Sequence, residues 1–420
     1  MEVYKFGGAS VKDSPGLKNL GEIVLKRKSN KLIVVVSAMA KTTNALEEVL
    51  FSWQDGDVKN ALDKIETIKL AHHKIVRESF PGLSSESVLN QVNDFFLKLA
   101  ALVKLSPSEN KSYNYDKVVS FGELVSTHIV YQYLLSLKLS CAWVDAGDLI
   151  RSDNNYRNAK IDWDKTRDNC QKYLTKSKAD IIITQGFIAK TAEGQRTTLG
   201  REGSDFTGAI LAYSVDAESL TIWKDVPGLL NADPRKFPDT VKLDEISYRE
   251  ALELSYYGAS VIHPKTVKPL QNKSIPLYIK PFGDCTASGS KVYHADHYDA
   301  DVPSYIVKEK QILISISPRD FSFMVEEHLM GVFAAFAKHG ITMNLMQNSA
   351  ISFSAVVDDS QQLKDLVEHL KGDFQVLYNT EVSLVTIRHY NEDIIKRLTN
   401  GKNVLVEQKT RQTARFVCAS

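Results

Sequence analysis

The sequence predicts an α/β protein with a mainly parallel sheet sandwiched by helices, followed by smaller βαββαβ modules. Three observations support this prediction. Apolar strand-like runs alternate with helical patterns over the first 290 residues, several of these runs end on glycine or hydroxyl residues, and the order of elements changes from Gln311 onward. We therefore expect one large domain over residues 1–290 and two modules, over residues 305–378 and 379–420.

The composition indicates which partners the protein can bind and in which compartment it is found. Lys and Arg (52) nearly balance Asp and Glu (51), leaving a net charge of +1, so no strong field attracts nucleic acid or a membrane surface. No apolar run is long enough to span a bilayer and residues 1–6 lack a signal-peptide pattern, so we expect a cytoplasmic protein. The four cysteines form no C-x-x-C pair and are expected to be small buried hydrophobic residues.

The first predicted strand, Val3–Phe6, runs directly into Gly7 and Gly8. A glycine pair at the end of a strand can wrap backbone donors around a phosphate while Lys5 neutralises its charge. The alternative is a simple turn beside a solvated lysine. The common nucleotide-binding signatures are absent, so nucleotide binding would need another design.

The run Leu32–Val36 predicts a strand buried on both faces, and a hydroxyl-rich loop follows it over residues 37–44. Residues 46–104 have the apolar spacing of helices. The pair His72 and His73 lies in this region. Because adjacent helical residues do not face each other, a surface position is favoured over a metal site.

A further helix is predicted to open at Val118, with Glu123 near its start. That carboxylate either complements the helix dipole or binds an ammonium group. Strands are expected at residues 142–146 and 181–187. Together these elements give the parallel sheet with helices on its faces.

Residues 197–235 combine a tight glycine-bearing turn with a helix start, in which Ser204 or Asp205 would cap a helix over residues 206–213. Free N–H groups at a helix start favour an anion, and Arg201 adds a fork suited to carboxylate or phosphate. A strand over residues 220–223 would then deliver Lys224 and Asp225 to its carboxyl end. The alternative is a helix cap followed by a surface loop.

From Gln311 the predicted order is strand, helix, two strands, helix and strand, which is a ferredoxin-like module. The predicted elements cover residues 312–316, 326–338, 343–349, 352–357, 361–370 and 374–377. A second, shorter copy follows over residues 382–387, 391–398, 403–408 and 415–418.

These pieces jointly resemble the aspartate kinases of the amino-acid-kinase superfamily, over essentially the whole chain. The resemblance is carried by KFGGAS (5–10), VVSAMAKTTN (35–44), FGELVST (121–127), TQGFIA (184–189), TTLGREGSDFT (197–207), WKDVPGLLNADPR (223–235) and GASVIHP (258–264). It implies the amino-acid-kinase fold, with C-terminal tandem ACT modules that bind an end-product amino acid.

The resemblance implies transfer of the γ-phosphoryl group of ATP, bound with Mg²⁺ as co-substrate, to the side-chain carboxylate of L-aspartate. Such transfer needs positioning and charge neutralisation, and a carboxylate nucleophile needs no general base. The implied catalytic residues are Lys5, Arg201 and Asp205. The implied substrate-binding residues are Ser37, Thr43, Glu123, Phe187, Arg201 and Ser204. The implied ATP-binding residues are Lys5, Gly7, Gly8, Lys224, Asp225 and Arg235.

The resemblance also implies feedback regulation of the first step of lysine, threonine and methionine biosynthesis. We expect a homodimer through the ACT-like modules, with lysine as the effector and threonine as the alternative. The implied effector-binding residues are Met343, Asn344, Gln347, Asn348 and Ser349.

Two other interpretations stay open, a related kinase for another acidic substrate such as glutamate, and an inactive amino-acid sensor. Glu123 with Arg201 argues against the first, and the retention of Lys5 and Asp205 beside them argues against the second. Many aspartate kinases carry Thr where Lys224 stands and Lys where Ser260 stands. We therefore hypothesise that Lys224 supplies a phosphate-facing cation that Ser260 cannot.

No dedicated metal site is expected, because magnesium would come through ATP oxygens and water. His263, which precedes a proline, is interpreted as a structural histidine at a turn. His294 and His297 are interpreted as solvated loop residues, since no third ligand is in view.

Overall fold

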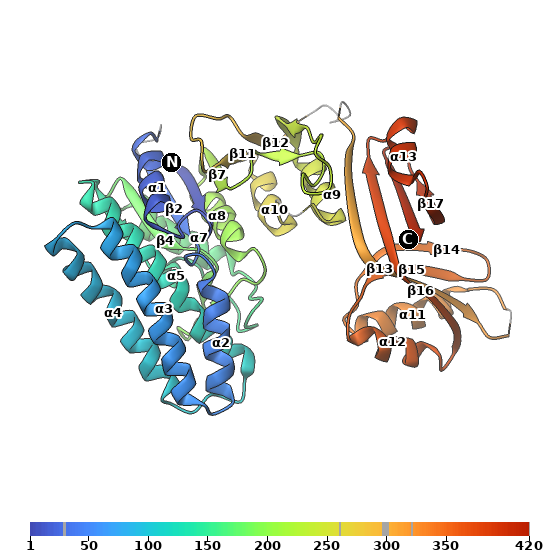
Figure 1. The fold of residues 1–420 in the computed structure, drawn as a ribbon, viewed down its shortest axis with the longest axis horizontal. Coiled ribbons are helices and arrows are strands. Elements are labelled where there is room, and N and C mark those ends of the chain that lie inside the picture. Colours follow the sequence, from blue (N-terminus) through green and yellow to red (C-terminus); the bar gives the residue numbers. More distant parts are fainter. Residues whose placement is uncertain (28–30, 260–261, 296–301, 321, 420) are drawn as a thin grey trace. The chain divides into compact units, whose positions relative to one another are not determined.

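A computed structural model describes residues 1–27, 31–259, 262–295, 302–320 and 322–419 (Figure 1). Two residues named above, Ser260 and His297, lie outside this set. The chain forms two compact units. One comprises Met1–Leu229, Lys242–Leu252 and Val261–Tyr298, and the other Leu230–Val241, Glu253–Ser260 and Asp299–Ser420.

The N-terminal unit is built on an eight-stranded sheet in the order β10-β12-β11-β7-β1-β2-β4-β3. Its strands are β1 Glu2–Phe6, β2 Leu32–Val36, β3 Cys141–Trp143, β4 Ile181–Gln185, β7 Ser219–Lys224, β10 Glu245–Ser247, β11 Leu277–Pro281 and β12 Ser290–Tyr293. All neighbours pair in parallel except β11 with β12. The predicted mainly parallel sheet is confirmed.

Helices cover both faces of this sheet. The helices of this unit are α1 Ser14–Leu25, α2 Thr42–Gln54, α3 Val58–Ser79, α4 Leu83–Val103, α5 Lys111–Ser136, α6 Ala146–Leu149, α7 Trp163–Cys170, α8 Gly203–Ser214 and α10 Pro264–Asn272, and the first half of α9 Tyr248–Tyr257 also belongs to it. Alternate residues of β1 and β2, such as Phe6 and Val34, share one core with α1–α5, whereas α8 contacts β1, β2 and β7. Figure 1 shows α2, α3, α4 and α5 side by side.

Two short strand pairs stand apart from the eight-stranded sheet. β5 Ile188–Lys190 and β6 Arg196–Thr198 form a hairpin, and β8 Leu229–Leu230 pairs with β9 Lys242–Leu243. A single π-helical turn, Gln171–Thr175, continues α7. Because Thr198 ends β6, this hairpin leads the chain straight into the turn before α8.

The C-terminal unit carries a six-stranded antiparallel sheet in the order β14-β15-β13-β16-β18-β17. Its elements are β13 Ser304–Pro318, α11 Glu326–Lys338, β14 Met343–Asn348, β15 Phe353–Asp358, α12 Gln362–Leu370, β16 Phe374–Arg388, α13 Glu392–Thr399, β17 Asn403–Lys409 and β18 Thr413–Ala419. The predicted βαββαβ order is confirmed. The helices of its first half share a core with β13, β15 and β16.

One difference from the prediction lies in the length of two strands. β13 and β16 each run for 15 residues through both halves of the sheet, where the sequence predicted shorter strands. Each contains a left-handed residue, Lys310 with φ 53° and Glu381 with φ 55°, where the pairing register shifts. These bulges mark where the two halves of the sheet meet. The module boundary at residue 378 stays a prediction.

Two side-chain predictions need correction. His72 and His73 are buried, with 2% and 7% exposure, rather than on the surface, and His72 Nδ1 lies 2.8 Å from the Ile68 carbonyl oxygen. Of the cysteines, Cys170 and Cys418 are buried, whereas Cys141 and Cys285 are half-buried. No helix in the described part of the chain is long and apolar enough to cross a bilayer.

Candidate active site

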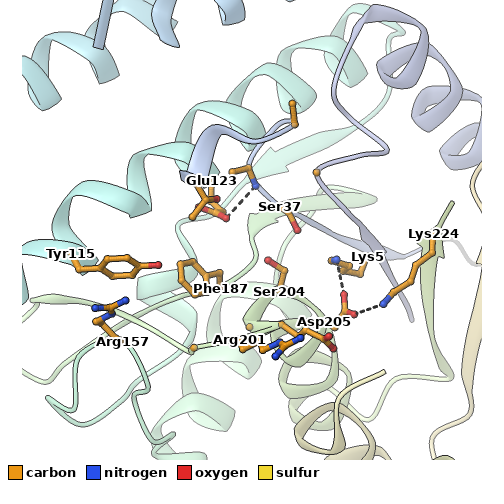
Figure 2. Close-up of a pocket in the computed structure, with 17 residues that line it drawn as sticks. Lys5, Ser37, Tyr115, Glu123, Arg157, Phe187, Arg201, Ser204, Asp205 and Lys224 are labelled. Atoms are coloured by element: carbon orange, nitrogen blue, oxygen red, sulfur yellow. Dashed lines mark hydrogen bonds and ion pairs between the residues drawn. The ribbon is translucent and has the colours of Figure 1, made fainter. Parts of the chain in front are cut away.

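A cavity of about 590 Å³ opens at the carboxyl ends of β1, β2, β4 and β7 (Figure 2). Parallel strands bring their carboxyl ends to one edge of the sheet, where ligands of such folds bind. Its lining residues are Lys5, Gly8, Ser37, Ala38, Ala40, Thr43, Tyr115, Glu123, Arg157, Phe187, Gly200, Arg201, Glu202, Gly203, Ser204, Asp205 and Lys224.

One end of the cavity holds three charged side chains in contact. Lys5 Nζ lies 2.6 Å from Asp205 Oδ1, and Lys224 Nζ lies 3.0 Å from Asp205 Oδ2. Burial would raise the pKa of Asp205, but Lys5 and Lys224 outweigh it and hold that pKa below its ordinary value. The triad carries a net charge of +1 inside the protein, so it suits a phosphoryl group.

The turn before α8 differs from the prediction. Glu202, in left-handed backbone with φ 55°, is the N-cap residue and makes no side-chain capping bond, while Ser204 and Asp205 lie within the first turn. The predicted cap by Ser204 or Asp205 is therefore wrong. The carboxylate of Asp205 instead forms ion pairs with the two lysines, because β1 and β7 place these lysines beside the start of α8.

Glu123 is a buried carboxylate at the middle of the cavity. It lies well inside α5 rather than at its start, so the predicted complement to a helix dipole is wrong. Glu123 Oε1 accepts a hydrogen bond from Ala38 N at 3.2 Å, and Oε2 has no partner among the described residues. Burial raises the pKa of Glu123 to about 8. Such a carboxylate gains from a cationic ligand.

Left-handed backbone is concentrated around the cavity. Ala40, Phe187 and Glu202 have φ of 50°, 67° and 55°, although none is glycine. Phe187 N donates to Thr207 Oγ1 at 2.9 Å, which fixes that residue over the first turn of α8. A side chain at Gly8 would collide with the Ala38 carbonyl oxygen. Strain of this kind is typical of sites that hold groups in set positions.

The far end of the cavity is formed by Tyr115 and Arg157. The guanidinium carbon of Arg157 lies 4.1 Å from the centre of the Tyr115 ring, and Tyr115 Oη donates to Glu47 Oε1 at 3.1 Å. Figure 2 shows this pair on one side of Glu123 and Phe187, and the lysine–aspartate triad on the other.

The comparison with protein families decides the assignment. The model of the amino acid kinase family matches residues 1–281, which is most of the chain and contains every residue of the cavity. The chain belongs to the amino acid kinase family.

Individual relatives of this amino acid kinase are aspartokinases. It is 29% identical to the lysine-sensitive aspartokinase 3 of Escherichia coli, over 96% of this chain and 89% of that protein. It is 34% identical to the chloroplastic bifunctional aspartokinase/homoserine dehydrogenase 1 of Arabidopsis thaliana, over 69% of this chain and 32% of that protein. The chain therefore spans about a third of the length of the bifunctional plant relatives it matches.

A solved structure extends the likeness to the fold. The structure of E. coli aspartokinase III in complex with aspartate and ADP matches with a TM-score of 0.79 and 26% identity, over all of this chain and 96% of that one. The structure of the Clostridium acetobutylicum aspartate kinase matches with a TM-score of 0.80 at 20% identity.

The cavity of this amino acid kinase brings together most of the residues singled out in the sequence. They are Lys5, Gly8, Ser37, Thr43, Glu123, Phe187, Arg201, Ser204, Asp205 and Lys224. Gly7 and Asp225 do not line the cavity, although a Cβ atom at Gly7 would lie 3.7 Å from Lys5 Nζ and Asp225 directly follows Lys224. Arg235 is exposed and paired with Asp233 at 2.8 Å. Their contacts with ATP stay predictions.

Sequence reasoning missed the other end of the site. Tyr115 precedes the FGELVST motif by two helical turns, and Arg157 lies in the loop between α6 and α7. No motif or spacing marks either residue. His263 was interpreted correctly, since its Nδ1 accepts a hydrogen bond from Lys265 N at 3.1 Å and caps α10.

Four of the five implied effector residues are in β14, and Ser349 follows it. Asn344 has the most contacts: its side chain bonds Lys308 Nζ at 2.9 Å, Gln311 Oε1 at 2.8 Å and Asp358 Oδ1 at 3.1 Å. Gln347 and Asn348 are exposed. The role of these residues in effector binding stays a prediction.

Proposed function

We propose that this chain is an aspartate kinase, which transfers the γ-phosphoryl group of ATP to the side-chain carboxylate of L-aspartate and gives 4-phospho-L-aspartate. The observation that supports this most directly is one cavity that has a lysine–aspartate–lysine triad at one end and is also lined by Arg201 and by the buried Glu123, one oxygen of which has no described partner. The relatives, including the E. coli enzyme bound to aspartate and ADP, agree with it.

In this proposal an oxygen of the aspartate side chain attacks the γ-phosphorus as the bond to ADP breaks. Lys5 and Lys224 neutralise the charge on the transferring group, and Asp205 fixes both ammonium groups in place. Gly7, Gly8 and Ser37 border the path of the phosphoryl group. The reaction depends on positioning and electrostatics and forms no covalent link to the protein.

The amino-acid part of the substrate is recognised by opposite charges. Glu123 takes the α-ammonium group, because its buried Oε2 lacks a partner among the described residues. Arg201 takes the α-carboxylate, and Thr43, Phe187 and Ser204 complete the pocket. Ionisation of Glu123 is then stabilised by the ligand itself.

Magnesium enters this proposal with ATP. Among the described residues no group of three or more His, Cys, Asp or Glu side chains could hold a metal ion, and both oxygens of Asp205 are already paired with lysines. A triphosphate supplies its own oxygen ligands, and water completes the octahedron that Mg²⁺ requires. Asp225, Arg235 and Lys224 would lie along the nucleotide.

The C-terminal unit is proposed to be regulatory and to join two copies of the chain. Its large apolar side chains Phe323, Met330 and Leu377 are 69%, 69% and 63% exposed. Covering such side chains with a partner removes their apolar surface from water, which favours association. A homodimer would cover it, with the effector near β14. We propose lysine as the effector, with threonine as the alternative, and a cytoplasmic location.

The test is ADP release with MgATP and L-aspartate, with hydroxylamine added to trap the acyl phosphate as a hydroxamate. We expect turnover that requires aspartate and that lysine or threonine suppresses. Turnover with glutamate alone would favour the related kinase. No turnover with either amino acid would favour the sensor. Light scattering that gives a monomer would contradict the dimer.

A further inference from the structure

One cation at the cavity wall, Arg157, forms no ion pair with any described residue. Arg157 is exposed at the cavity wall, and among the described residues its guanidinium makes no hydrogen bond or ion pair. Its contact is the face of Tyr115, 4.1 Å from the ring centre. A guanidinium that lies on a ring keeps its five N–H donors for a ligand.

The backbone of Arg157 is held in an unfavourable conformation. Its φ is 67°, in the left-handed region that favours glycine. Arg157 N donates to both carboxylate oxygens of Asp116, at 3.2 and 3.0 Å. Asp116 is fully buried and also accepts from Thr198 N at 2.9 Å and Thr198 Oγ1 at 2.7 Å.

These contacts tie Arg157 to the turn that carries Arg201. Thr198 is the last residue of β6, and the turn before α8 follows it directly. A side chain at Gly200 would lie 3.1 Å from the Arg157 carbonyl oxygen, so the two loops are in close contact. One buried carboxylate therefore positions the segments that bear both arginines.

Arg157 lies at the end of the cavity where the α-carboxylate of an amino-acid acceptor is expected. Figure 2 shows Arg157 and Tyr115 on the opposite side of Glu123 from Lys5 and Asp205. An acceptor whose side-chain carboxylate faces Lys5 directs its α-carboxylate away from that end. We propose that Arg157, held on Tyr115, is a second guanidinium for the α-carboxylate, in addition to Arg201, and so determines acceptor specificity. The inference rests on the proposed function.

The test replaces Arg157 with glycine, which fits the left-handed backbone and leaves the fold intact. We expect KM for aspartate to rise about five- to tenfold, with kcat within about twofold and KM for MgATP unchanged. Arg157→Lys, which keeps the charge but not the planar fork, should recover less than half of the loss. The dissociation constant for aspartate, measured by calorimetry, should rise by the same factor as KM.

The matched control is Lys138→Gly. Lys138 is also an exposed cation in left-handed backbone, with φ 60°, but it lies at the end of α5 outside the cavity. Unchanged aspartate binding in Arg157→Gly, or an equal change in both variants, would overturn the inference. A wild-type chain that binds aspartate without phosphorylating it would overturn the proposed function alone, because the binding comparison would still measure Arg157. A wild-type chain that does not bind aspartate would overturn both.

Discussion

Two parts of the cavity differ in whether their charged side chains are paired within the protein. At one end, the ammonium groups of Lys5 and Lys224 are paired with the buried Asp205 before any substrate arrives. Away from this triad, Glu123 at the middle of the cavity has a buried oxygen without a described partner, and Arg157 at the far end is exposed, as is Arg201. Under the proposed function, the charges are paired in advance where the phosphoryl group is transferred, whereas Glu123 gains its partner from the ammonium group of the substrate.

The largest expected effect comes from removing the carboxylate of the lysine–aspartate triad. Asp205→Asn removes the carboxylate that both largely buried ammonium groups contact, so we expect kcat to fall by at least about 100-fold. Unfolding free energy should also fall, by roughly 3–5 kcal/mol. Steady-state kinetics and urea denaturation measure the two effects.

The control for this variant is Asp145→Asn. Asp145 is a largely buried carboxylate paired with Arg196 at 2.6 Å, and it lies outside the cavity. It should lose stability while kcat is kept. Equal losses of kcat in both variants would show that the triad acts only through folding.

The role of Glu123 is tested by the variant Glu123→Gln and by the pH dependence of stability. Losing the carboxylate should raise KM for aspartate about 10- to 100-fold, as expected for a hydrogen bond to a charged group. Because burial raises the pKa of Glu123 from 4.5 to about 8, the folded protein holds a proton between these values that the unfolded chain has released. Stability of the wild type should therefore fall as pH rises through this window.

Glu123→Gln lacks this titration, so its stability relative to the wild type should grow from pH 5 to pH 8. Urea midpoints at the two pH values measure the difference. Parallel pH dependences of the two proteins would mean that Glu123 is already ionised in the free protein.

A smaller effect is expected from Lys224→Thr, which keeps Lys5 and Asp205. We expect kcat to fall about tenfold, or ~1.4 kcal/mol of barrier, together with a weaker affinity for MgATP. The aspartate dissociation constant should stay the same. Unchanged kinetics would contradict a phosphate-facing role for Lys224.

The smallest effect is expected for Arg235→Ala. Arg235 is exposed and paired with Asp233, so its loss should leave the thermal midpoint unchanged and raise KM for MgATP by less than about threefold. A larger change would place the nucleotide closer to this residue than its exposure indicates.

The sequence alone predicted the parallel sheet and most of the residues at the triad end of the cavity. It could do so because glycines, hydroxyl residues and charges that directly follow apolar strands are typical of ligand sites in such sheets. Lys5 is the next-to-last residue of β1 and Lys224 the last of β7, and these two strands are parallel neighbours in the sheet. It did not predict that Asp205 pairs with both. Side-chain pairing across β1, β7 and α8 depends on the arrangement of three separate elements.

The other failures share one cause. Tyr115 and Arg157 meet only because Asp116, Thr198 and a left-handed loop bring distant segments together. His72 was predicted to be exposed, but α3 packs against α2 and α4 and buries both faces that the doublet occupies. Local patterns carry no information on such packing.

The long strands β13 and β16 set a constraint on how the C-terminal unit is made. Ser304 pairs with Arg388 and Pro318 with Phe374, so β13 is synthesised well before its central partner. Until then one edge of β13 is open to pairing with other chains. Non-local pairing of this kind slows folding. The nascent chain therefore carries an aggregation hazard that ends only when β16 has left the ribosome.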